Sequence, residues 1–164
     1  SARKYILLLF IVTLAIISFL IIFPSKNKEL EIIKNGHFEG MPNKTVAELV
    51  NLLSASRAKW SVMELLVDNK PKKLVVASWE NIKGKEYKIL FNYPSPDNNY
   101  VTIYEIFIND EPRGWIAIAR FLDIFGLLDK GLSPKEALSK QLKEQEKNIK
   151  IQKKESVYEK KDNI

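Results

Sequence analysis

Residues 5–23, YILLLFIVTLAIISFLIIF, divide this chain of 164 residues into two unlike parts. No residue in the stretch is charged, and only Thr13 and Ser18 interrupt its apolar character. With a rise of about 1.5 Å per residue, a helix of this length would span roughly 28 Å, close to the ~30 Å hydrocarbon core of a bilayer. Because backbone groups in lipid must pair within the segment, we expect one N-terminal transmembrane helix here.

The flanks of this stretch bear on its processing and orientation. Arg3 and Lys4 precede it, as in secretory signals and in uncleaved anchors. Its end, Ile-Ile-Phe-Pro-Ser at 21–25, offers no pair of small residues for signal peptidase, so we expect an uncleaved signal-anchor. Positive charges nearly balance across the stretch. A four-residue N-terminal tail usually stays in the cytoplasm, which favours an extracytoplasmic domain; a cytoplasmic domain is the open alternative.

The net charge of +6 lies at the two ends of the chain. Residues 1–35 carry five Lys/Arg and two Glu (+3), residues 36–132 carry twelve of each sign (0), and residues 133–164 carry nine Lys and six acids (+3). A nucleic-acid reader more often has a basic face within its folded module, so we expect no nucleic-acid partner. The charged ends fit anionic lipid or an acidic partner better.

The part that follows the apolar stretch predicts a small α+β domain. Residues 29–34, ELEIIK, predict a short strand. Thr45 and Glu48 form a capping-box pattern, and apolar residues at helical spacing follow. Strand-like runs then occupy 60–67, 74–80, 85–91 and 100–109. We therefore expect a two-layer domain with one helix packed on an antiparallel sheet of about four to five strands.

Two later segments complete the predicted organisation. Residues 115–128, WIAIARFLDIFGLL, are either a core helix or strand, an interfacial helix, or a docking surface. Ser133, Pro134 and Glu136 mark the start of a long charged helix, whose thin apolar stripe contains glutamines. The predicted divisions are a cytoplasmic tail (1–4), the transmembrane anchor (5–23), a linker (24–29), the α+β domain (30–131) and a charged helical tail with a disordered end (132–164).

The sequence contains no catalytic or cofactor motif that we recognise. The absence of cysteine excludes disulfides, a thiol nucleophile and a Cys-bound metal. His37 is the only histidine; no nucleophile-elbow sequence accompanies it, and with Glu39 it supplies two metal ligands, fewer than a zinc site needs. We therefore predict no catalytic, cofactor-binding or metal site, and no small-molecule substrate. The candidate partner-binding residues are aromatic: Trp79, Tyr93, Trp115, Phe121 and Phe125.

The block Lys34-Asn35-Gly36, Pro42-Asn43-Lys44-Thr45-Val46 and Trp60 resembles a module of bacterial lipoproteins and membrane-anchored envelope proteins. In that module a strand ending in Lys-Asn-Gly leads into a helix, and a Trp opens an antiparallel meander. The similarity covers about residues 30–110. This chain has Ala47-Glu48-Leu49 where Gly-Glu-Ala is usual, and an anchor helix in place of a lipid. The resemblance implies an envelope location and no defined activity.

Together these observations predict a single-pass, non-enzymatic binding or scaffold protein of the bacterial cell envelope. Its N-terminus would lie in the cytoplasm and its domain in the periplasm or cell exterior. Its partners would be the lipid bilayer, through residues 5–23, and another protein of a membrane or envelope complex. Two alternatives stay open: an accessory subunit of a larger secretion, conjugation or respiratory complex, and a membrane-bound hydrolase.

Overall fold

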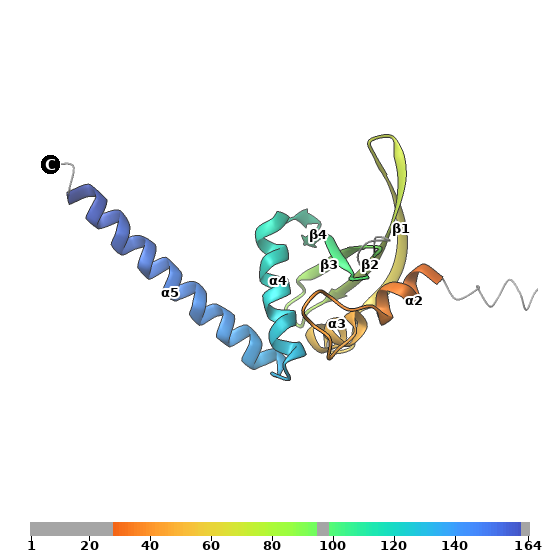
Figure 1. Ribbon diagram of the computed structural model, residues 1–164, viewed down its shortest axis with the longest axis horizontal. Helices are drawn as coiled ribbons and strands as arrows, with labels where there is room; N and C mark the ends of the chain where they lie inside the picture. Colours follow the sequence, from red (N-terminus) through yellow and green to blue (C-terminus); the bar gives the residue numbers. More distant parts are fainter. Residues whose placement is uncertain (1–27, 95–98, 162–164) are drawn as a thin grey trace, which may run out of the picture.

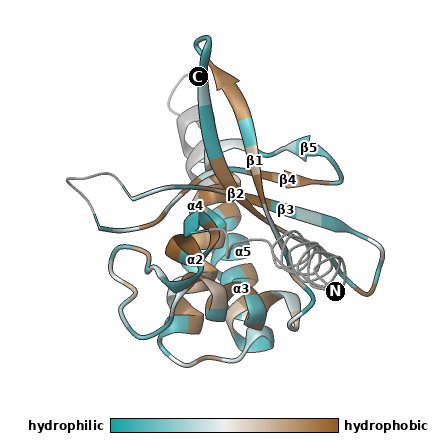
Figure 2. Cartoon of the chain, turned by 90° about the vertical axis from the view of Figure 1, so that its right-hand side faces the viewer, coloured by the Kyte–Doolittle hydropathy of each residue, from teal (hydrophilic) through white to brown (hydrophobic). Residues whose placement is uncertain are grey.

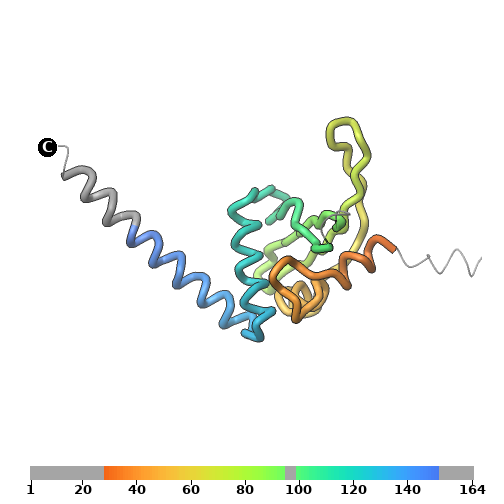
Figure 3. The backbone as a smooth tube through the Cα atoms, viewed as in Figure 1, coloured from red at the N-terminus to blue at the C-terminus, as the bar shows by residue number. Residues whose placement is uncertain are grey.

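Five antiparallel strands form a twisted sheet, and three helices cover one of its faces (Figure 1). The computed structural model describes residues 28–94 and 99–161, and their side chains as far as residue 151. A fourth, long helix leaves the body of the domain (Figure 3). In chain order the elements are α2 (Lys28–Asn35), α3 (Val46–Ser54), β1 (Lys59–Val67), β2 (Lys70–Glu80), β3 (Glu86–Asn92), β4 (Thr102–Ile108), β5 (Glu111–Pro112), α4 (Gly114–Asp129) and α5 (Pro134–Lys161).

The sheet is a simple meander in the order β1-β2-β3-β4-β5, with every neighbouring pair antiparallel. Two-residue turns close two of its hairpins: Asp68 and Asn69 join β1 to β2, and Asn109 and Asp110 join β4 to β5. All four residues have φ between 51° and 62°. Positive φ at both central positions is typical of type I′ turns, whose twist matches that of the strands. The predicted α+β class and antiparallel meander are confirmed.

The core lies between the sheet and the helices, where apolar side chains from both layers meet. Figure 2 shows apolar segments, coloured brown, on both the strands and the helices. Phe38, in the loop between α2 and α3, links the layers: its ring centroid lies 6.3 Å from that of Phe91 on β3 and 5.4 Å from that of Phe125 on α4. Phe91 and Phe125 are completely buried. Burying an aromatic ring of this size removes a large apolar area from water, so this cluster contributes strongly to stability.

The first described element differs from the prediction: residues 29–34 belong to helix α2, so the expected strand is wrong. Leu30 and Ile32 alternate with acidic residues as in a strand, but Ile33 is the residue that reaches the core. Short apolar runs fit either period, and tertiary packing decides between them. Gly36 follows the helix and packs closely against the loop before β4. A Cβ at this position would lie only 2.5 Å from Val101 Cγ2, so a larger residue would require a shift of this loop.

Helix α3 begins as its sequence predicts. The Thr45 amide donates to Glu48 Oε2 (2.7 Å), and the Glu48 amide donates to Thr45 Oγ1 (3.3 Å). This reciprocal pair satisfies two amides that the helix itself leaves unpaired. With α2 and α4 beside it, α3 is one of three helices on the sheet, where a single helix was expected.

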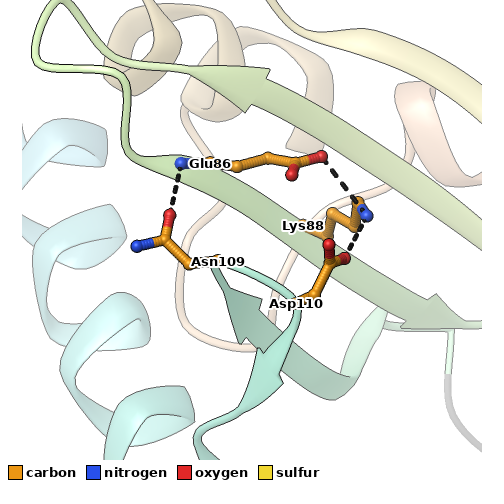
Figure 4. A network of polar contacts seen from close by, with 4 residues as sticks. All are labelled: Glu86, Lys88, Asn109 and Asp110. Carbon is orange, nitrogen blue, oxygen red and sulfur yellow. Dashed lines mark hydrogen bonds and ion pairs between the residues drawn. The ribbon is translucent and has the colours of Figure 1, made fainter.

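A polar network joins the central strand β3 to the turn between β4 and β5 (Figure 4). Lys88 on β3 pairs with Glu86 at 3.3 Å and with Asp110 in the β4–β5 turn. Asn109 Oδ1 in the same turn accepts a hydrogen bond from the backbone amide of Glu86 at 2.9 Å. Hydrogen bonds from Lys88 to Asp110 and then to Glu86 raise the pKa of Lys88. The network therefore ties the last hairpin to β3 without contributing to the core.

The predicted membrane segment, residues 5–23, lies outside the described residues, as do residues 162–164 at the end of the tail. Among the helices in the described part of the chain, none combines the length and the apolarity that a bilayer span requires.

Asp129, at the end of α4, makes the most extensive buried polar contact in the described domain. It is 5 % exposed, and its Oδ1 accepts the amides of Asn43 (3.0 Å) and Lys44 (2.8 Å). Its Oδ2 accepts a hydrogen bond from Asn43 Nδ2 at 3.0 Å. The carboxylate thereby joins the loop before α3 to the corner between α4 and α5. This corner lies more than eighty residues after that loop in the sequence.

Replacing Asp129 with Ala should lower the free energy of unfolding by about 2 kcal/mol, because the part-buried amides of Asn43 and Lys44 lose their acceptor. Urea denaturation monitored by tryptophan fluorescence measures the change. Asp123→Ala, an exposed carboxylate on the same helix, is the matched control and should change stability little. Equal effects of the two substitutions would contradict this account.

The capping box of α3 should also make stability depend on pH. Hydrogen bonds from the Thr45 amide and then the Thr45 hydroxyl lower the pKa of Glu48 below its ordinary value of 4.5. A lowered folded-state pKa stabilises the fold above pH 4.5, and this contribution is lost as pH falls through the folded-state value. Wild type should therefore be more stable than Glu48→Gln at pH 7, and the difference should shrink in acid.

Urea midpoints of wild type and Glu48→Gln, measured from about pH 7 to about pH 3, test this dependence. Glu39→Gln removes an exposed loop carboxylate and serves as the control. A difference between wild type and Glu48→Gln that stays constant over the whole range would contradict the prediction.

Candidate functional site

An apolar groove of about 400 Å³ lies where α4, α5 and the edge of the core meet, and we call it the α4–α5 groove. Its floor contains side chains from α3 and the sheet: Leu53, Trp79, Tyr87 and Ile108. One wall is formed by α4, with Ala117, Arg120, Phe121 and Ile124, and the other by α5, with Leu138, Gln141, Leu142 and Gln145. A mostly apolar lining with a few polar groups is typical of a binding site.

The floor of the groove is rigid because it is built from paired aromatic rings. Trp79 on β2 and Tyr87 on β3 are register partners, and their rings stack with centroids 5.4 Å apart and planes 11° apart. The centroid of the Tyr87 ring also lies 6.3 Å from that of the Phe121 ring on α4. Stacked rings on neighbouring strands have little freedom to move, so the floor presents a fixed apolar surface.

The start of α5 is fixed to α4 at the closed end of the groove. Ser133 and Glu136 cap the helix: the Ser133 amide donates to Glu136 Oε2 at 2.9 Å, and the Glu136 amide donates to Ser133 Oγ at 3.3 Å. Ala137 is completely buried in the core, and Gln141 Nε2 donates to the Arg120 carbonyl at 2.8 Å. The predicted start of this helix is confirmed.

Beyond these contacts α5 diverges from α4, and the two helices form an open V (Figure 1). Apolar side chains remain exposed along α5, including Leu142 at 61 % and Ile149 at 52 %. The first turn of α4 is exposed in the same way, with Trp115 at 76 %. Exposed apolar groups of this size on neighbouring helices indicate an interaction surface.

The predicted aromatic residues have different positions in the structure. Trp79 and Phe121 are buried except where they line the α4–α5 groove, and Phe125 is completely buried against Phe38. Trp115 is the exposed member of the set, at the start of α4. Residues 115–128 are therefore a helix whose second half belongs to the core and whose first turn is exposed.

Tyr93 lies in a second, more polar groove of about 820 Å³ between α2 and β2. Lys28, Lys72 and Lys73 line this groove, and Lys73 pairs with Glu29 at 3.3 Å. Burial raises the pKa of Tyr93, whose Oη has no hydrogen-bond partner within the described part of the chain. The groove is open and basic, and its facing carboxylate is already paired with a lysine.

His37 has a local structural contact. Its Nδ1 lies 3.0 Å from the Lys44 carbonyl, which links the two ends of the loop between α2 and α3. Across residues 28–94 and 99–151 no group of three or more His, Cys, Asp or Glu side chains is arranged to hold a metal ion.

Sequence reasoning missed two features of the α4–α5 groove. One is the role of Asp129, which fixes the corner at its closed end; nothing in the sequence pairs this carboxylate with Asn43. The other is the convergence of Trp79, Tyr87 and Phe121, which come from three different elements. Apolar spacing assigns each residue to the core face of its own element, but not to a shared groove.

Comparisons with protein-family models, with curated proteins and with solved structures find no match to this chain.

A charge at Ala137 should detach the start of α5 and open the groove. Ala137→Asp would bury an unpaired carboxylate, which costs several kcal/mol, so the helix should separate from α4 instead. We expect hydrogen exchange in the first turns of α5 to accelerate at least about tenfold. Ser139→Asp places the same charge two residues away on the exposed side of the helix and should leave exchange unchanged. Equal acceleration in both variants would contradict the prediction.

Proposed function

We propose that this chain is a single-pass, membrane-anchored binding or scaffold protein of the bacterial cell envelope, with its α+β domain outside the cytoplasm. The observation that carries the proposal is the α4–α5 groove, whose lining includes the exposed apolar side chain of Leu142. Exposed apolar area of this kind is unfavourable in water and is covered favourably by another protein. The lining contains stacked rings and amides, which suit packing against a helix or an apolar segment.

The anchor supports the same function by placing the domain close to a bilayer. Residues 5–23 have the length and composition of a membrane span. The chain between residue 23 and the start of α2 at Lys28 is short, and fully extended it would cover at most about 18 Å. The domain therefore works within one protein diameter of the membrane surface. The resemblance of about residues 30–110 to a module of bacterial envelope proteins supports the same location.

Deleting residues 5–23 should release the protein from membranes, because the remaining chain has no comparable apolar stretch. After an alkaline carbonate wash, wild type should stay in the membrane pellet and the deletion variant should move to the supernatant. A variant lacking residues 152–164 is the control and should stay in the pellet. Retention of the anchor deletion in the pellet would contradict the proposed anchor.

Protease added to right-side-out spheroplasts tests the orientation. We expect digestion of the domain, while a cytoplasmic control protein stays intact. Protection of the domain under conditions that digest an external control would place it in the cytoplasm.

Purification in mild detergent separates the scaffold role from the alternative, an accessory subunit of a larger complex. A scaffold should bind its partner reversibly, whereas a subunit should purify with partners in fixed stoichiometry. Leu142→Ser should weaken capture of a partner that binds in the α4–α5 groove, and Ser139→Ala should not.

A further inference from the structure

As far as residue 151, three of the four exposed large apolar residues of α5, Leu138, Leu142 and Ile149, share one face of the helix with the half-buried Gln145, whereas Ile151 lies on the other side. Leu138, Leu142, Gln145 and Ile149 follow one another at intervals of four, three and four residues. These intervals place them on one face of the helix, at the a and d positions of a coiled coil. We call this face the α5 stripe. Its first three residues also line the α4–α5 groove, so the stripe and the groove are one continuous surface.

The lysines of α5 are separated from this stripe. Lys140, Lys143, Lys147 and Lys150 are all exposed, and their spacing of three, four and three residues places them together on the opposite face of the helix. A second helix could therefore approach the stripe without meeting this row of positive charge. Between Leu138 and Ile149 no stripe position is a lysine; Lys135, one heptad position earlier at the start of the helix, lies on the same face.

We propose that the α5 stripe pairs with the α5 stripe of a second copy of this chain, in parallel and in register, and that the partner helix also covers the α4–α5 groove. In this arrangement each stripe residue meets its own equivalent. Leucine and isoleucine pack against themselves, and the two Gln145 amides donate to and accept from each other. Polar residues at core positions of this kind specify register at some cost in stability.

The antiparallel alternative matches less well. It would place Leu142 of one helix against Gln145 of the other, which buries an amide without a polar partner. In the parallel pair, Gln141 of one helix flanks Glu146 of the other, so an amide donor faces a carboxylate. The parallel dimer also keeps both copies in one orientation along its two-fold axis, which allows both anchors to enter the same bilayer.

The stripe has fewer than two complete heptads, so the pair is weak in dilute solution. Confinement to a membrane raises the effective concentration of the two helices, as linking does for tethered binding modules. A second copy of this chain is then the occupant of the α4–α5 groove, which goes beyond the scaffold function proposed above. The pairing is the same whichever side of the membrane holds the domain.

Single cysteines test the pairing cleanly, because the chain contains no cysteine of its own. Gln145→Cys lies on the stripe, and Lys147→Cys lies on the lysine face two residues away. With the full chain in its membrane, mild oxidation followed by a non-reducing gel should give at least about tenfold more disulfide-linked homodimer for Gln145→Cys than for Lys147→Cys. Equal yields, or a Gln145→Cys protein that stays monomeric, would overturn the proposal.

Further variants fix the cause and the direction of the pairing. Adding Leu142→Glu to Gln145→Cys should lower the homodimer yield about tenfold, whereas adding Lys143→Glu should leave it high. Circular dichroism and the membrane pellet show whether each variant still folds and stays anchored, which keeps failure of the dimer distinct from failure of the anchor. Differently tagged Leu138→Cys and Ile149→Cys proteins should not cross-link to each other. A strong link between these two positions, or links only to other proteins, would overturn the parallel dimer.

Discussion

The carboxylate of Asp129 is the interaction on which the arrangement of the helices depends. It lies at the end of α4, a position that the helix dipole makes unfavourable for a negative charge, and it accepts amides from Asn43 and Lys44 in the loop before α3. The buried hydrogen bonds compensate for this position. Because α5 begins at Pro134, shortly after this point, the same contact fixes the corner from which α4 and α5 diverge.

The position of this corner determines which residues form a surface. The capping contacts of Ser133 and Glu136 and the burial of Ala137 hold only the first turns of α5 against α4. Farther along, the helix leaves the domain and its apolar side chains are exposed. The apolar groove and the α5 stripe are therefore left outside the core cluster, and the stacked rings of Trp79 and Tyr87 lie in the floor of the groove.

The strands and helix starts could be read from the sequence because local chemistry specifies them. Strand-like runs marked β1 to β4, with clear alternation of apolar residues in 85–91, and hydroxyl and glutamate residues three positions apart marked the starts of α3 and α5. Residues 29–34 were misread because six residues are too few to distinguish two periods. Packing of Ile33 into the core and the close approach of Gly36 to Val101 make this segment a helix.

The sequence by itself determined the division into a long apolar stretch and a polar domain, the antiparallel meander, and the heptad spacing on α5, because each follows from residues close together in the chain. Tertiary structure alone decided that three helices share one face of the sheet, that Asp129 meets Asn43, and that Trp79, Tyr87 and Phe121 form one floor. These contacts join residues far apart in sequence. Their formation depends on how the layers pack, which local periodicity does not encode.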